Sequence, residues 1–444
     1  MKQLLFMVLS TAYGTVGSFA IGPHVGLTVY FLFAVMRPQF IWEWSLSNFG
    51  LSGFAWSYYV AMAALAATII TAPGKPRHRL QFPHFAVWGL AIWVTLSFLM
   101  ARNREFAQQH YTEIVKIFVM FTAATWGIRS LSHLWALLVT ITLADIYIAL
   151  EVNQYYFLDG YMFLARQGFG GLDNNGAALQ FAMGVPLCYF LWESTPQRWR
   201  WGYVLGIALL GHAVLLSFSR GAMLSLIVTC PLLLILSQHK RKVIVFLALA
   251  FAVVVVTAGP DVKDRFLSIS KHDADESANS RKTSWMIAIR MANEEPLFGF
   301  GVRNSVLYTR AYGADMEGRA IHSMYLQLAA DAGWVGMGCF LVVLGSTWFV
   351  CARTWWRLRG RDDPDAVRTQ TIAAAVAYSL AVYSFGAIFL SLDTFEMPYI
   401  LVLIGAQLAS LGTPAGPTHA TTQAVAPLVV GWPYPWLPLN TPLR

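Results

Sequence analysis

Three arginines and one histidine stand at points where a strongly apolar chain becomes polar. They occur in Ser219-Arg220-Gly221, Ser280-Arg281-Lys282, Gly301-Val302-Arg303 and Ile321-His322-Ser323. Arginine binds phosphate oxygens through paired hydrogen bonds and keeps its proton, whereas a neutral histidine, with a pKa of about 6.5, accepts a proton at neutral pH. We therefore expect these residues to bind an anionic substrate, for which a lipid-linked diphosphate sugar is the best candidate.

The composition indicates the class of protein. Hydrophobic residues make up 57% of the 444, charged residues only 12%, and the mean hydropathy is +0.53. A soluble domain carries roughly 25% charged residues. The sequence therefore predicts an all-α polytopic membrane protein in a lipid bilayer. The net charge of +8 does not indicate a nucleic-acid partner, because the basic residues cluster in short loops between apolar segments.

The apolar segments predict the spans. A transmembrane helix needs about 17–25 apolar residues. Such segments lie near 52–72, 84–101, 111–128, 131–152, 174–193, 201–218, 221–238, 242–259, 323–352, 369–391 and 396–412. Residues 1–36 contain two more apolar stretches around Gly22-Pro23, which form either one broken span or a short hairpin. We favour one broken span, which gives about 12 transmembrane helices.

Basic loops predict the orientation, because cytoplasmic loops are enriched in lysine and arginine. These loops lie at 75–79, 198–200, 239–242 and 353–361. With the spans above, all four fall on the same side. The loops 37–51, 153–173 and 260–322 then face the periplasm of a bacterial inner membrane, and both termini face the cytoplasm. Lysine and arginine are normally scarce on the periplasmic side, so the four motif residues are out of place there unless they serve a function.

The chain divides into two predicted parts. Residues 1–412 form a single transmembrane domain, which includes the periplasmic loop 260–322. Residues 413–444 are rich in proline and are expected to be a disordered cytoplasmic tail. The four cysteines lie in apolar segments without any CxxC spacing, so we interpret them as buried small hydrophobic residues.

The loop 260–322 holds nine basic and nine acidic residues, so any anion binding must come from particular arginines. We expect Ser280 to cap a helix from Arg281 to Glu295, which Pro296 ends. The first turn of that helix would present Arg281 together with backbone N–H groups, a favourable place for a phosphate. The turn Phe298-Gly299-Phe300-Gly301 that follows would let backbone approach a ligand closely.

Three ionisable residues, Lys116, Asp145 and Asp331, fall in the predicted outer halves of their spans. Charged residues within a membrane usually face an interior cavity and a partner. Their shared position suggests a water-filled vestibule that opens to the periplasm.

An ordered set of motifs resembles the O-antigen ligase family of polytopic glycosyltransferases. The set comprises Leu172-Asp173-Asn174-Asn175, Phe218-Ser219-Arg220-Gly221, Ser280-Arg281 with Trp285, Pro296-Leu297-Phe298-Gly299-Phe300-Gly301, His322-Ser323-Met324-Tyr325-Leu326-Gln327-Leu328 and Asp331-Ala332-Gly333-Trp334-Val335-Gly336. The resemblance covers roughly residues 165–350. The N-terminal third, with Ala34-Val35-Met36-Arg37-Pro38, looks like a branch of putative O-glycosylation ligases of exopolysaccharide systems.

The resemblance implies a metal-independent enzyme with no cofactor. Such an enzyme transfers a glycan from an undecaprenyl-diphosphate donor to a hydroxyl on lipid A core, a protein or another glycan. It also implies that Arg220 and Arg281 bind the donor diphosphate and that His322 receives the proton of the acceptor.

Further residues are candidates from their positions alone. Arg303 follows a glycine turn and either binds the diphosphate or covers the loop. Asp173 and Asn174 either cap the helix that begins there or contact the substrate. Asp331 is a candidate substrate contact, with two alternatives: a partner of His322 or of an arginine, or a polar contact between helices. Arg166 and Gln167, in the loop 153–173, are candidate sugar or phosphate contacts.

Other functions are compatible with the same pattern. A polymerase of O-antigen or exopolysaccharide would use a second lipid-linked repeat unit as acceptor, with a nearly identical site. An organic-anion transporter would also use internal arginines, but transporters tend to have repeated halves and helices broken at the midplane. A metal-dependent transferase is disfavoured, because the outer loops contain no persuasive acidic metal cluster. Their one metal-like pattern, Asp273-Ala274-Asp275, lies in a generally charged stretch.

Overall fold

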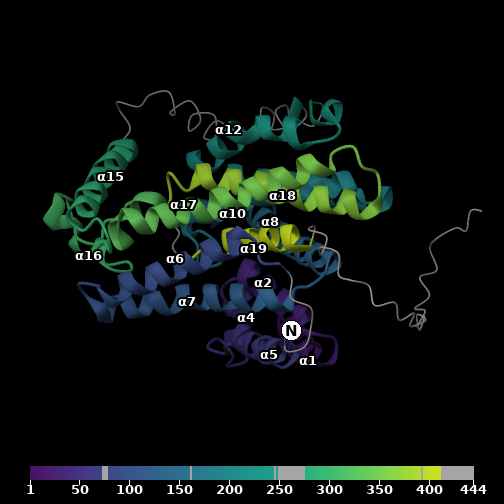
Figure 1. The fold of residues 1–444 in the computed structure, drawn as a ribbon, viewed down its shortest axis with the longest axis horizontal. Helices are drawn as coiled ribbons and strands as arrows, with labels where there is room; N and C mark the ends of the chain where they lie inside the picture. The colour runs from purple at the N-terminus through teal and green to yellow at the C-terminus, as the bar shows by residue number, and fades with distance from the viewer. Residues whose placement is uncertain (73–78, 161–162, 245–246, 249–275, 392–393, 412–444) are drawn as a thin grey trace, which may run out of the picture. The chain divides into compact units, whose positions relative to one another are not determined.

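The computed structural model describes residues 1–72, 79–160, 163–244, 247–248, 276–391 and 394–411, and these residues are helical and connected by short loops (Figure 1). The helices are α1 (Lys2–Ala20), α2 (Pro23–Met36), α3 (Pro38–Ile41), α4 (Glu43–Ser47), α5 (Trp56–Thr71), α6 (Phe82–Leu99), α7 (Arg104–Gly127), α8 (Leu131–Asp159), α9 (Phe163–Gln167), α10 (Asn174–Ser194), α11 (Gln197–Leu216), α12 (Arg220–Leu236), α15 (Glu276–Glu294), α16 (Ser305–Tyr308), η3 (Thr309–Tyr312), α17 (Met324–Leu358), α18 (Pro364–Gly386) and α19 (Met397–Leu411).

The predicted all-α membrane fold agrees with this architecture. Ten of the predicted apolar segments coincide with helices, and the eleventh, 242–259, lies mostly outside the described residues, as does the predicted tail. Among the described helices, five are long and apolar enough to cross a membrane by length and composition, namely α1, α6, α8, α11 and α17. The chain is a multi-pass membrane protein, while the count of about twelve spans and the assignment of sides stay predictions.

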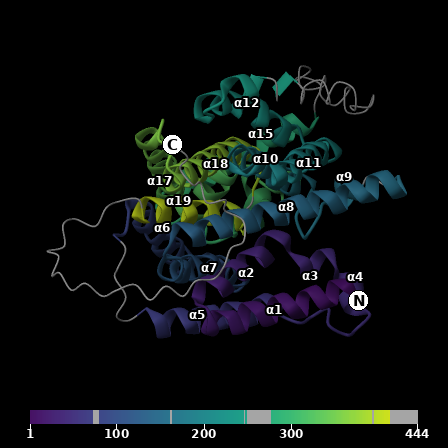
Figure 2. The same cartoon turned by 90° about the vertical axis from the view of Figure 1, so that its right-hand side faces the viewer.

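The first two helices form a hairpin, which differs from the single broken span that we favoured. Gly22 adopts a φ of +151°, and α1 and α2 then pack against each other and against α5 (Figure 2). A β-carbon on Gly17 would lie 2.7 Å from Val25. The ring of Phe6 stacks edge-on against Trp42 at 5.5 Å, so the beginning of α1 and the segment after α2 lie at the same end of the bundle. This geometry contradicts the prediction that the two lie on opposite sides of the membrane.

Helix α10 is at the centre of the bundle. It packs against α8, α11, α12 and α18, and almost every side chain from Gly176 to Leu191 is buried. Small residues permit the close approach, because a β-carbon on Gly184 would meet Asp145 and Leu210, and one on Gly206 would meet Ile146. The position of the α10 N-terminus is therefore set by four neighbouring helices.

Four helices start at the same end of the bundle with a side-chain cap, and we call this end the site end. The caps are Asn103 for α7, Asp173 for α10, Ser219 for α12 and Ser323 for α17. A capping side chain satisfies a backbone N–H that has no partner within the helix. Of the two residues that we considered as helix caps or substrate contacts, Asp173 is a true cap.

Helix α17 is interrupted at Gly333, whose φ is 74° and ψ is 172°. The turn that follows α15 packs into this break, with Phe300 N donating to Ala330 O, Gly301 N to Asp331 O and Trp334 N to Pro296 O, each at 2.9 Å. The glycines of the turn therefore permit close approach to α17 backbone rather than to a ligand: a β-carbon on Gly299 would lie 2.4 Å from the carbonyl carbon of Asp331.

Helix α15 begins earlier than predicted, at Glu276, and ends at Glu294 as Pro296 requires. Ser280 is therefore within the helix instead of capping it, and Arg281 is not in a first turn with unpaired N–H groups. The buried face of α15 consists of Ser284, Ile287, Ala288, Met291 and Ala292, while Ile289 is 38% exposed.

The break in α17 leads to a stability prediction. Replacing Gly333 with alanine would place a β-carbon 2.1 Å from Leu297 O at a φ and ψ that are essentially restricted to glycine. We expect a loss of at least about 1–3 kcal/mol in stability, measured as a lower melting temperature in detergent. Gly338→Ala in the same helix is the control, because a β-carbon there meets nothing within 4 Å. Equal melting temperatures for the two variants would contradict this account of the break.

Candidate active site

Two of the sequence motifs are bound to each other at the site end. Asn174 Nδ2 donates to Ser217 O at 3.1 Å, and Ser219 Oγ donates to Asn175 Oδ1 at 2.8 Å. The first turn of α10 is thereby fastened to the turn between α11 and α12. Because the turn continues directly into Arg220, the asparagines fix the position of this arginine relative to α10.

The turn itself has a strained backbone. Phe218 has a φ of +54°, and the turn is closed by the Ser217 side chain, whose Oγ accepts from Ser219 N at 3.0 Å. Ser219 then caps α12, and Arg220 is the first residue of that helix. Positive φ in a bulky residue has a cost and persists only when surrounding contacts hold it in place.

His322 lies in the short non-helical segment before α17, and hydrogen bonds hold this segment to two other parts of the chain. The carbonyl oxygen of His322 accepts from Trp285 Nε1 of α15 at 3.3 Å. On the opposite side, Ser323 N donates to Ser391 Oγ at 3.3 Å, and Met324 N donates to Ala387 O at 2.9 Å. His322 therefore lies between α15 and the segment that follows α18.

Charges from three segments act on His322. Burial lowers the pKa of His322, the positive charges of Arg281 and Arg319 lower it further, and the carboxylate of Asp173 acts in the opposite direction. Arg281 of α15 and Asp173 of the α10 cap are therefore near enough for their charges to act on the histidine. At neutral pH the histidine is in its neutral form, which can accept a proton.

The backbone strain of the chain is concentrated at these segments. Among the described residues, four that are not glycine have a positive φ: Arg37, Phe218, Arg303 and His322. Three of them belong to the motifs that the sequence singled out for chemistry, and the fourth contacts the loop that leads to α10. Residues in such conformations often cluster at functional sites.

Asp331, in α17, bonds the segment that follows the turn at 296–301 and that carries Arg303. The carboxylate of Asp331 accepts from Ser305 N at 2.9 Å and from Gln327 Nε2 at 2.6 Å. Arg303 precedes Asn304, whose side chain bonds the backbone of Asn103. Through its bond to Ser305, Asp331 thus holds the segment that carries Arg303. The contact of Asp331 with a substrate stays a prediction.

Arg102 is a residue of this region that the sequence reasoning missed. Its guanidinium carbon lies 3.7 Å above the Phe300 ring, and Nη2 pairs with Glu294 at 2.8 Å and Glu295 at 3.0 Å. The α6–α7 connection is thereby joined to the end of α15. An Arg-Asn pair in a short loop gave no signal of this role, because its partners are almost 200 residues away.

The remaining predicted candidates are more dispersed. Arg166 and Gln167 are exposed at the end of α9. Lys116 is 55% exposed and pairs with Glu113, whereas Asp145 is fully buried beside Gln180. Lys116, Asp145 and Asp331 therefore have separate surroundings, and the vestibule that we predicted from them is not formed by these side chains.

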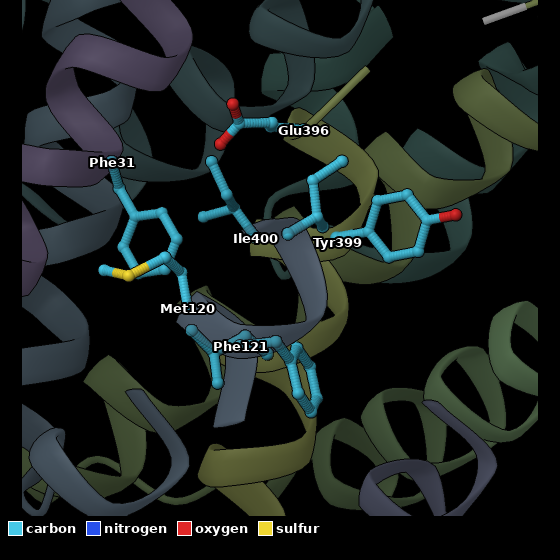
Figure 3. A pocket seen from close by; sticks show the side chains of 8 residues that line it. Phe31, Met120, Phe121, Glu396, Tyr399 and Ile400 are labelled. Carbon is cyan, nitrogen blue, oxygen red and sulfur yellow. The ribbon is translucent and has the colours of Figure 1, made fainter. Parts of the chain in front are cut away.

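Two small pockets lie beside the site rather than in it. One is lined mainly by apolar residues of α2, α7 and α19, with Glu396 as its carboxylate (Figure 3). The other lies under Arg37 and is lined by Leu172 and Gln180 among apolar side chains. Arg37 Nη1 donates to Gly170 O at 3.3 Å, which ties the end of α2 to the loop before α10.

The contact between the two motifs can be measured by a double-mutant cycle. Ser219→Ala removes both a helix cap and the bond to Asn175, so we expect it to cost about 1–2 kcal/mol. Asn175→Ala should cost about 1 kcal/mol, and the double variant less than the sum, with a coupling of about 0.5–1.5 kcal/mol. Denaturation in detergent measures all three, and strictly additive losses would contradict the contact.

Comparison with known proteins supports the resemblance over part of the chain. Residues 205–341 match the family model described as O-antigen ligase. The matched segment runs from α11 into α17 and includes Arg220, Arg281, Arg303 and His322. No match to the chain was found among curated proteins. The resemblance indicated by the ordered motifs is confirmed for residues 205–341, which are similar to the O-antigen ligase family.

Proposed function

We propose that this protein is a glycosyltransferase of the ligase type, which moves a glycan from an undecaprenyl-diphosphate donor to an acceptor hydroxyl. The observation that supports this most directly is the position of His322, with Arg281 and Asp173 acting on it from two other segments. A proton acceptor beside a cationic phosphate-binding group is what this transfer requires.

In the proposed reaction, the acceptor oxygen attacks the anomeric carbon of the donor sugar. The new bond forms to that carbon as its bond to the diphosphate oxygen breaks, and the electron pair leaves with the diphosphate. Arg281 and Arg220 stabilise the added negative charge on the leaving group, with each charge-assisted hydrogen bond worth roughly 1.5–3 kcal/mol. The acceptor proton passes to the imidazole of His322.

The roles of the other residues follow from their positions. Ser219, Asn174 and Asn175 hold the turn that carries Arg220. Arg303 is proposed as a further diphosphate contact. The acceptor is lipid A core, a protein or a glycan, and a second lipid-linked repeat unit would make the enzyme a polymerase. We place the site on the periplasmic face of the bacterial inner membrane, following the basic loops.

The transporter alternative is less consistent with where the cations lie. Arg220 is the first residue of its helix, and Arg281 belongs to α15, outside the apolar helices. A transporter would be expected to place its substrate-binding groups near the bilayer midplane.

Substitution of the three central residues tests the proposal. Purified protein would be given a lipid-diphosphate glycan and each of the acceptors, with a chelator present. We expect His322→Ala, Arg281→Ala and Arg220→Ala each to lower transfer by about 100-fold or more. Lys282→Ala is the matched control, because it removes an exposed charge next to Arg281. Full transfer by correctly inserted His322→Ala and Arg281→Ala proteins would refute the assignment. Loss of transfer by the unsubstituted protein when chelator is added would refute metal independence.

The pH dependence supplies a second test. As a general base His322 acts in its neutral form, so kcat/KM should rise with pH through the pKa of His322 in the free enzyme. Because burial and Arg281 lower this pKa, the acidic limb should have its midpoint below the usual histidine value of about 6.5. A midpoint above that value, in an enzyme inactivated by His322→Ala, would show that another group sets the limb.

A further inference from the structure

The segment that ends at His322 is attached to α15 at two points. At the first point, Arg319 Nη2 donates to Ser280 Oγ. At the second, Trp285 donates to the His322 carbonyl, as described above. Ser280 and Trp285 flank Arg281 in the sequence of α15, and Arg319 and His322 are three residues apart. The two hydrogen bonds therefore set the register between the element that carries Arg281 and the element that carries His322.

The guanidinium of Arg319 makes a second contact that orients it. Its Nη1 pairs with Asp315, four residues earlier, in addition to the Nη2 bond to Ser280. The side chain of Arg319 is only 24% exposed, whereas that of Asp315 is 61% exposed. A planar guanidinium can donate in two directions at once, whereas the single ammonium group of lysine cannot reproduce this geometry.

We propose that Arg319 is a positioning residue of the transfer site, which holds His322 beside Arg281 by fastening its segment to Ser280. This inference rests on the proposed function, in which Arg281 binds the diphosphate and His322 accepts the proton. The proton acceptor and the leaving-group stabiliser come from elements separated by 41 residues, so their spacing requires a tie of this kind. A misplacement of about 1 Å can cost about 100-fold in rate.

Arg319 also acts on His322 through its charge. Three charged groups act on the histidine: Arg281 from α15, Asp173 from the start of α10, and Arg319 from its own segment. The two arginines favour the neutral imidazole and the aspartate favours the protonated form. Removing Arg319 therefore shifts the balance toward Asp173, and the pKa of His322 should rise.

Three variants separate the position from the charge, measured as kcat, KM for the acceptor and the pH profile of transfer. Arg319→Ala should lower kcat about 10- to 100-fold and move the acidic limb to higher pH, with little change in KM. Arg319→Lys keeps the charge, so its acidic limb should stay in place while kcat falls. Ser280→Ala removes only the acceptor of the hydrogen bond and should behave like Arg319→Lys.

Controls distinguish this inference from the function on which it rests. Arg310→Ala removes an exposed arginine from the same loop and should leave both kcat and the acidic limb unchanged. An Arg319→Ala enzyme with an unchanged kcat or an unmoved acidic limb would overturn the inference, provided that His322→Ala is inactive. An active His322→Ala enzyme would instead overturn the proposed function.

Discussion

The site end depends on the backbone hydrogen bonds between the turn after α15 and the interruption of α17 at Gly333. Buried peptide groups without partners are costly, and a membrane bundle has little water to satisfy them. The broken helix therefore needs a second non-helical segment with complementary N–H and C=O groups, which the turn at 296–301 supplies. Asp331 and Arg102 reinforce this joint with side-chain contacts. The segment from 303 to 322 is consequently held at both its ends. The bonds between the turn and α17 hold its beginning, and the bonds to α15 hold its end.

Strain and positioning have the same origin in this protein. His322 and Phe218 hold positive φ values that an isolated chain would relax. The contacts that keep them strained also bring the motifs together: Trp285 and Ser391 hold the backbone around His322, while Asn174 bonds the turn that contains Phe218. The candidate active site is therefore preorganised by neighbours from α10, α15 and the segment after α18, which suits a reaction in which charge develops on a leaving group.

Much of the architecture could be predicted from one sequence. Apolar length predicted ten helices with bounds that differ from the observed ones by up to seven residues, and Pro296 ended α15 as predicted. The errors came where tertiary contacts override local signals. A serine before a helical pattern is a usual cap, yet Ser280 lies inside α15 and accepts from Arg319. Gly22-Pro23 permits either a kink or a reversal, and the choice is made by side-chain packing of α1 against α2 and α5.

The amino-acid sequence by itself determined the class of protein, its helical segments and the residue types that indicate a family, because hydropathy and motif order are local properties. Only the tertiary structure decided which of these residues meet. The partner of Asn174 is 43 residues away, and that of Arg102 nearly 200, so no spacing rule in the chain could pair them. The same holds for Arg319, which looks like an ordinary loop arginine until folding brings Ser280 within reach of its guanidinium.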